Sequence, residues 1–153
     1  MSRPSKAAGS VALVTGANRG IGLAFVRELA ARGAKKVYAG VRSPNALAEE
    51  FAGLPAEVVP LDVTDQAAVA AAANACPDVN LLVNNAGLFT NTRLVQTSDP
   101  DAARREMEVN YFGTLNMTRA FAPLLGANDV HATEREHGPG EQGELCHTMI
   151  TFV

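Results

Sequence analysis

The stretch Thr15 to Gly22, TGANRGIG, separates a short apolar run from a helical repeat. The run before it, Ser10 to Thr15 (SVALVT), is rich in β-branched residues and predicts a buried strand. After it, apolar side chains recur four residues apart, which predicts a helix over 21–32 that ends at Gly33 in a left-handed conformation. The side chains expected on the buried face of this helix are Ile21, Phe25 and Leu29, with Ala24 beside them.

The glycines of this turn suit the binding of a pyrophosphate. Glycine lets the backbone turn sharply and approach a phosphate without a clash from a Cβ atom. The helix that begins here directs free N–H groups and the positive end of its dipole at the same place. The spacing G-x-x-x-G-x-G differs from both the G-x-G-x-x-G fingerprint and the Walker A loop. A tight strand-to-helix turn without a ligand is therefore an open alternative on the glycines alone.

The rest of the chain alternates between strand and helix patterns. Further strands are expected at Lys36 to Val41, Glu57 to Leu61 and Asn80 to Asn84, with Pro60 indicating that the strand containing it lies at an edge. This alternation predicts an α/β fold, a doubly wound parallel sheet of about four strands with helices on both faces. The helices between the strands are expected at 45–51, at 65–75 with Thr64 as N-cap, from Asp99-Pro100 onward, and at about 104–125.

One domain is expected from a length of 153 residues. Residues 1–9 are interpreted as a flexible arm and residues 10–127 as the folded domain. Residues 128–153 break the pattern, because they lack periodicity before Thr148, and we interpret them as an atypical, disordered tail. Only Met149 to Val153 could add another strand.

Composition excludes several classes of protein. The first 42 residues hold eight of the 13 Lys and Arg residues, which favours an anionic ligand or simply reflects an uneven surface. A pI of about 5.6 without a basic stripe argues against a nucleic-acid partner, and the apolar runs are too short to span a membrane. No secretory signal is evident, so a cytoplasmic location with reduced cysteines is expected. No metal site is expected from the spacing of His131, His137, Cys146 and His147.

Four motifs, in order over residues 10–125, resemble the short-chain dehydrogenase/reductase family. They are the glycine turn, Leu61-Asp62-Val63-Thr64, Asn84-Asn85-Ala86-Gly87, and Asn110 after Met107-Glu108-Val109. The resemblance implies a Rossmann-like fold that binds a nicotinamide dinucleotide, with Asp62 holding the adenine amino group and Asn110 as the structural and catalytic asparagine. The cofactor-binding residues that it implies are Gly16, Asn18, Arg19, Gly20, Ile21, Gly22, Arg42, Asp62, Val63, Asn84, Ala86 and Gly87.

Charge at the end of the second strand bears on the choice of dinucleotide. A site that prefers NAD usually carries an acidic residue there, to bind the ribose 2′-hydroxyl. Here Val41 occupies that place and Arg42 follows, while Arg19 is expected near the same ribose. Two guanidinium groups without a carboxylate suit a 2′-phosphate, so the sequence predicts NADP(H) in preference to NAD(H).

The resemblance also implies a serine, a tyrosine and a lysine in a Tyr-x-x-x-Lys pattern, and these are missing. The only tyrosines are Tyr38 and Tyr111, and the last lysine is Lys36. We therefore expect a truncated oxidoreductase, of the kind that moves hydride between NADP(H) and a carbonyl or alcohol, that is inactive by itself. The alternatives are a non-catalytic NADPH-binding module and a non-functional frameshift or splice product. An uncovered strand at 80–84 and an uncovered helix at 104–125 are expected, with a homo-oligomer or a full-length subunit as possible partners.

Overall fold

Five parallel strands form one sheet in the order β3-β2-β1-β4-β5. The computed structural model describes residues 7–44, 50–92, 99–128 and 148–151. Within the sheet, Ala12 pairs with Val37 on one side and with Leu81 on the other, so β1 lies at the centre. The strands are β1 (Val11–Thr15), β2 (Lys36–Val41), β3 (Ala56–Pro60), β4 (Leu81–Asn84) and β5 (Thr148–Thr151).

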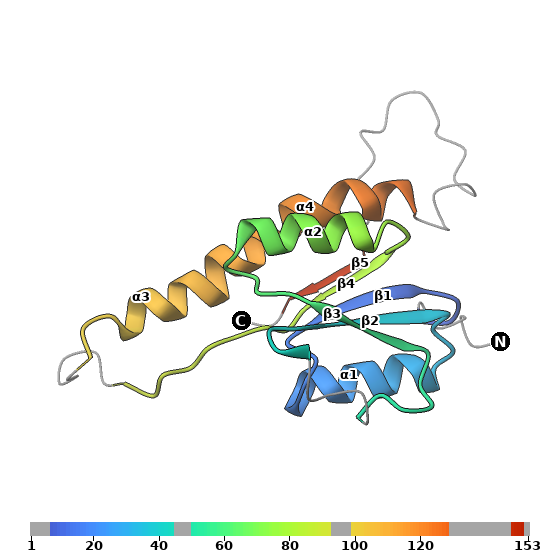
Figure 1. Ribbon diagram of the computed structural model, residues 1–153, viewed down its shortest axis with the longest axis horizontal. Coiled ribbons are helices and arrows are strands. Elements are labelled where there is room, and N and C mark those ends of the chain that lie inside the picture. Colours follow the sequence, from blue (N-terminus) through green and yellow to red (C-terminus); the bar gives the residue numbers. More distant parts are fainter. Residues whose placement is uncertain (1–6, 45–49, 93–98, 129–147, 152–153) are drawn as a thin grey trace.

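Helices cover both faces of this sheet. Helix α1 (Gly20–Ala31) lies on one face, and α2 (Gln66–Ala75) and α4 (Thr114–Ala127) lie side by side on the other (Figure 1). The α1 face holds a cluster around Val14, Val26 and Val37, joined by Phe51 from the connection after β2. The opposite face holds a second cluster around Leu13, Leu82 and Phe121. Together they confirm the doubly wound α/β fold.

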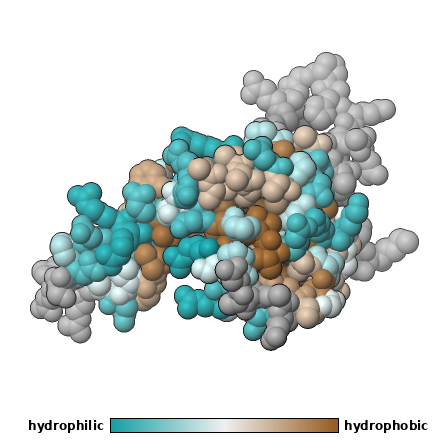
Figure 2. Space-filling view, in the orientation of Figure 1, coloured by the Kyte–Doolittle hydropathy of each residue, from teal (hydrophilic) through white to brown (hydrophobic). Residues whose placement is uncertain are grey.

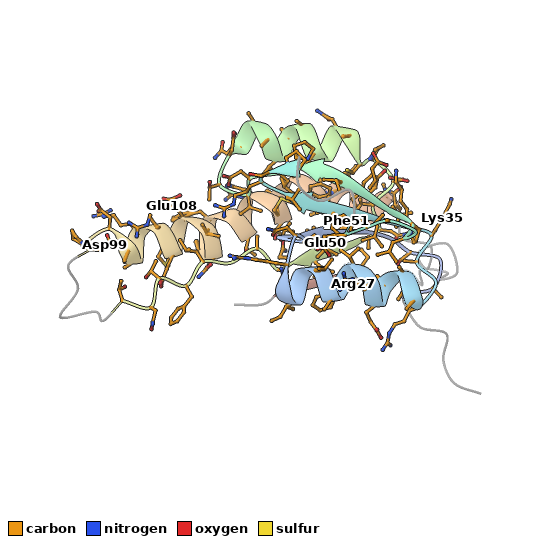
Figure 3. The ribbon with its side chains drawn as sticks, turned by 60° about the horizontal axis from the view of Figure 1, so that its bottom comes forward. Arg27, Lys35, Glu50, Phe51, Asp99 and Glu108 are labelled. Carbon is orange, nitrogen blue, oxygen red and sulfur yellow. The ribbon has the colours of Figure 1, made fainter. Side chains whose placement is uncertain are left out.

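A helical projection extends away from the sheet at the carboxyl ends of its strands. It consists of α3 (Ala102–Met107) and a π-helical turn, η2 (Glu108–Gly113), which continue directly into α4 (Figure 1). The extended segment 85–92 runs beside them. Figure 3 shows Asp99 at the tip of this projection, Glu108 closer to the sheet, and Lys35 at the opposite end of the molecule.

The strand predictions are confirmed within one residue at each end. The prediction that Pro60 marks an edge strand is also confirmed, because β3 is the outermost strand on its side. The prediction for Gly33 is confirmed too, since its φ is +84° at the end of α1. The helix predicted at 45–51 falls mostly on residues 45–49, which lie outside the described residues.

The face that α1 buries differs from the prediction. Gly22, Val26 and Leu29 are buried, whereas Ile21 is 65% exposed and Ala24 is also exposed. The helix is therefore turned by about one position relative to the pattern of large apolar residues. The cause is Gly22, whose lack of a side chain lets the helix sit directly on the loop after β1.

The predicted helix caps are each displaced. Asp65, not Thr64, caps α2, because the Asp65 side chain accepts hydrogen bonds from the N–H groups of Ala67 and Ala68. Asp99 does not cap α3, which begins at Ala102, although its carboxylate accepts a hydrogen bond from the N–H of Asp101. Predictions from N-cap residue types were therefore off by one position at α2 and by two at α3.

The apolar face predicted for 104–125 is interrupted by η2. The buried side chains of α4 are those of Met117, Phe121 and Leu125, while Phe112 is 43% exposed. A π-helical turn inserts extra residues into the helical repeat, so side chains before and after it point in different directions. This accounts for the irregular spacing seen in the sequence.

The two ends of the predicted domain need correction. Residues 7–9 are part of the fold and not of a flexible arm, because Ala7 is buried and the N–H of Gly9 donates to the carbonyl of Gly33. At the other end, β5 pairs with β4 from Leu81 to Asn84, so that strand is not left uncovered. The strand lies where Met149 to Val153 were the one candidate, and residues 129–147, most of the expected tail, lie outside the described residues.

Among the described residues, no helix is long and apolar enough to span a membrane.

Candidate functional site

The glycine turn after β1 is held in a shape that only glycine accepts easily. Gly16 has a φ of +65° and Gly20 a φ of +53°, in the left-handed region that favours glycine. A Cβ atom added at Gly22 would lie 2.1 Å from the carbonyl oxygen of Gly16. The close approach of α1 to this turn therefore depends on Gly22.

Hydrogen bonds from the end of β4 secure the same turn. The hydroxyl of Thr15, 1% exposed, accepts from the N–H groups of Asn85 and Ala86, each at 2.9 Å. The Asn85 amide donates in return to the carbonyls of Thr15 (3.0 Å) and Gly16 (3.2 Å). A Cβ at Gly16 would lie 3.0 Å from the Cα of Ala86. The loops after β1 and β4 thus form one rigid unit.

The free surface of this unit fits an anion. The first N–H groups of α1, at Gly20, Ile21 and Gly22, precede the first helical hydrogen bond, which runs from Leu23 to the carbonyl of Arg19. Nothing lies within 4 Å of a Cβ built at Gly20, so the backbone is open there. An open backbone at a helix N-terminus beside Arg19 fits the pyrophosphate of a dinucleotide.

Asp62 lies after β3, at the same edge of the sheet. Its Oδ1 atom accepts hydrogen bonds from the hydroxyl (2.7 Å) and the N–H (2.9 Å) of Thr64. These two bonds, with a smaller contribution from the positive charge of Arg42, hold the pKa of the Asp62 carboxyl below its usual range. A carboxylate therefore does lie within electrostatic reach of Arg42, although it comes from the loop after β3 and not from the end of β2.

Asn110 lies in η2, and its side chain binds the backbone of the segment that follows β4. Its Oδ1 atom accepts from the N–H of Leu88 (2.8 Å) and its Nδ2 atom donates to the carbonyl of Leu88 (2.9 Å). The backbone carbonyl of Asn110 accepts from the hydroxyl of Thr114 at 2.8 Å. Both ends of the amide are thus engaged, and in this structure Asn110 acts as a clamp on the extended segment.

The predicted site residues come from five segments at the carboxyl edge: the turn after β1, Arg42 after β2, the loop after β3, the end of β4 with the loop after it, and η2. The side chain of Val63 is buried against Gly113 and its carbonyl accepts a hydrogen bond from Asn116, so only the N–H of Val63 is left for a ligand. Sequence reasoning did not assign roles to Thr15, Asn85, Asn116 or Glu106, which hold the loops of the site. Asn85 belongs to the motif Asn84-Asn85-Ala86-Gly87, and its side-chain amide, a hydrogen-bond donor next to a strand end, is the signal that could have indicated its role.

Glu106 shows why such residues escape a reading of the sequence. It lies in α3, and its carboxylate accepts hydrogen bonds from the N–H and the hydroxyl of Thr90, which lowers the pKa of the Glu106 carboxyl. The contact secures the segment after β4 to the projection. Neither residue belongs to a motif, and the pair is separated by 16 positions.

The family model described as short chain dehydrogenase matches residues 10–131. The short chain dehydrogenase tazN of Aspergillus terreus is 42% identical over 127 residues, which cover 76% of this chain and 28% of that protein. Dehydrogenase/reductase SDR family member 7B of Bos taurus is 35% identical over 131 residues, covering 76% of this chain and 40% of that protein.

Solved structures share the fold as well. A short chain dehydrogenase from Burkholderia cenocepacia, crystallised in complex with NADP, superposes with a TM-score of 0.74 at 49% identity. The match covers 80% of this chain and 51% of the other. The chain therefore spans about half, or less, of the length of the relatives described here.

Proposed function

The chain belongs to the short-chain dehydrogenase/reductase family of oxidoreductases, and from this premise we propose that it binds NADP(H) across the carboxyl edge of its sheet. The observation that carries the proposal is the open glycine turn at the start of α1, fixed by Thr15 and Asn85. In a complete active site, NADPH held here would supply the hydride for the reduction of a carbonyl. The chain's own residues bind and orient the dinucleotide.

Each part of the dinucleotide has a proposed set of partners. The pyrophosphate lies against the turn formed by Gly16, Asn18, Gly20, Ile21 and Gly22. The adenine lies beside Asp62 and the N–H of Val63, and the nicotinamide half follows Asn84, Ala86 and Gly87. This order agrees with a sheet whose ligand crevice opens between β1 and β4, where the strand order reverses.

Preference for the 2′-phosphate is assigned to Arg19 and Arg42. Both side chains are exposed, and among the described residues neither forms an ion pair. The positive charge of Arg42 contributes to the lowered pKa of Asp62. This contribution supports a position of Arg42 beside the adenine end of the site. Charge-assisted hydrogen bonds from two guanidinium groups favour a phosphate over a hydroxyl.

Titration of both dinucleotides tests this assignment. Arg42→Ala is expected to weaken NADPH binding by about tenfold or more and to leave NADH binding nearly unchanged, the effect of losing one bond to a charged group. Arg32→Ala is the matched control, since Arg32 is also basic but pairs with Glu28 at the far end of α1. Equal losses for NADPH and NADH in Arg42→Ala would refute the assignment.

Catalysis by these 153 residues alone is not expected. The sequence contains no lysine after Lys36 and no tyrosine besides Tyr38 and Tyr111. Tyr38 is 3% exposed inside β2, and the Asn110 amide is fully used as a clamp. A general acid typically contributes about 10²–10⁴ to rate. We therefore infer a dinucleotide-binding module, and measurable carbonyl reduction by the purified chain would contradict this inference.

Association with another subunit is part of the proposal. Of the described residues, the large apolar side chains that are exposed lie mainly on the projection (Met107, Tyr111 and Phe112) and on the extended segment beside it (Phe89). Figure 2 shows hydrophobic residues where the projection leaves the sheet, behind a hydrophilic tip. Such a surface is typical of an interface. Sedimentation of the purified chain is expected to show an oligomer, and a monomer at all concentrations would contradict this expectation.

A further inference from the structure

One peptide group of the loop after β3 is held at both of its ends. The carbonyl of Val63 accepts a hydrogen bond from Nδ2 of Asn116, in α4, at 3.1 Å. The N–H of the same peptide, on Thr64, donates to Oδ1 of Asp62 at 2.9 Å. Because a peptide group is planar, fixing its carbonyl also fixes the direction of its N–H. The Asn116 amide therefore fixes the direction of the Thr64 N–H group, which in turn holds Oδ1 of Asp62.

Packing on the other side of the loop makes the contact specific. Val63 is 7% exposed, and a Cβ at Gly113 would lie 2.6 Å from its Cγ2 atom. The absence of a side chain at Gly113 thus lets Val63 sit close enough for the Asn116 amide to reach its carbonyl. With Val63 turned inward to the helix, its neighbour Asp62 lies at the carboxyl edge, within electrostatic reach of Arg42.

The remaining oxygen of Asp62 is suited to one kind of base. Both hydrogen bonds to the carboxylate converge on Oδ1, and within the described part of the chain none reaches Oδ2. An ionised carboxylate only accepts hydrogen bonds, and the pKa of this one is lowered. It is therefore complementary to the exocyclic amino group of adenine and not to the carbonyl oxygen of hypoxanthine.

We propose that Asn116 is a positioning residue for purine recognition, which holds Asp62 so that the site selects a 6-amino purine over a 6-oxo purine. The proposal rests on the dinucleotide binding proposed above and adds a residue 53 positions from the loop that it controls. Asn116 itself touches the backbone of Val63 and not the base.

The test compares NADPH with its hypoxanthine analogue, reduced nicotinamide hypoxanthine dinucleotide phosphate. The unmodified chain is expected to bind NADPH more tightly. Asn116→Leu keeps the approximate size of the side chain and removes the donor, and it is expected to reduce this preference by about threefold to tenfold, the effect of one neutral hydrogen bond. Arg119→Ala, at an exposed position on the same helix, is the control and should leave the preference unchanged.

The ratio of the two affinities separates positioning from a general structural effect. Equal weakening of both dinucleotides in Asn116→Leu would overturn the proposal, as would an equal affinity of the unmodified chain for the two. Asn116→Ala provides a second variant, and loss of the fold in both would show a structural residue and also overturn it. Failure of the unmodified chain to bind NADPH at all would instead refute the proposed function.

Discussion

The two edges of the sheet carry polar groups that are used in opposite ways. At the amino edge, the Lys36 amine contacts Glu57 at 2.6 Å and donates to the Tyr38 hydroxyl at 2.9 Å, which donates to Asp78 at 2.8 Å. At the carboxyl edge, the N–H groups that open α1 and the guanidinium groups of Arg19 and Arg42 have no such partners among the described residues. The polar groups of the amino edge thus bond one another, and we call it the closed edge. The groups of the carboxyl edge are left to bind a ligand, and we call it the open edge.

The difference teaches where to look for function in this fold. At the amino edge, hydrogen bonds to Glu57 and Tyr38 raise the pKa of Lys36. Burial raises the pKa of the nearby Cys76 thiol to about 11. Perturbed titration alone does not distinguish the two edges, because the pKa of Asp62 at the carboxyl edge is shifted as well. Open backbone and unpaired positive charge indicate the binding edge.

The largest effect is expected from Gly22→Ala at the open edge. A Cβ there would lie 2.1 Å from the carbonyl of Gly16, so the turn must move, at a cost of about 3 kcal/mol or more in the free energy of unfolding. Gly20→Ala is the control, because it meets no atom and should cost only about 1 kcal/mol for its positive φ. Denaturant titration measures both, and equal costs would show that the turn can relax around a methyl group.

A smaller effect, confined to the closed edge, is expected from Tyr38→Phe. Removal of the hydroxyl breaks its bonds to Lys36 and Asp78, which should lower the free energy of unfolding by about 1 kcal/mol. NADPH affinity should not change, since the Tyr38 hydroxyl bonds Lys36 and Asp78 at the amino edge, whereas Arg42 follows the carboxyl end of β2. A loss of NADPH affinity with an unchanged free energy of unfolding would contradict the separation of the two edges.

The smallest effect is expected from Thr64→Val, and it depends on pH. Because Thr64 lowers the pKa of folded Asp62 below the unfolded value of 3.8, its contribution to stability is present above that value and is lost as the pH falls through the folded pKa. The free energy of unfolding of the variant should be about 0.5 kcal/mol lower than that of the unmodified chain near neutral pH, and equal to it once Asp62 is protonated. Unfolding measured at several pH values checks this, and a difference that persists in acid would assign the effect to packing.

Much of the fold could be predicted because its strands are short, buried and bounded by turn residues. The direction in which α1 faces could not, since apolar size points to Ile21 while the sheet requires the smallest residue, Gly22, to lie inward. The π-helical turn at 108–113 was hidden for a related reason. It lies where Gly113 packs on Val63, and a tertiary contact of this kind has no local signature in the sequence.

The candidate site, like the fold, could be predicted only in part. Its loops were predicted in position, because glycine and asparagine motifs mark the ends of β1 and β4. The bonds that join them were not predicted, since the hydroxyl of Thr15 and the N–H groups of Asn85 and Ala86 are brought together only by the pairing of β1 with β4. Nor did the sequence indicate that both ends of the Asn110 amide would bind Leu88.

The link between Thr15 and the end of β4 has a consequence for how the chain folds. Its hydrogen bonds join residues 68 to 71 positions apart, so the glycine turn cannot be secured until β4 has docked beside β1. Contacts of such long range form at a high cost in loop entropy. In an intermediate built from β1, β2 and β3, the glycine turn would lack its hydrogen bonds to Asn85 and Ala86. A dinucleotide that requires the secured turn would bind only the finished sheet, and by mass action it would draw the folding equilibrium toward completion.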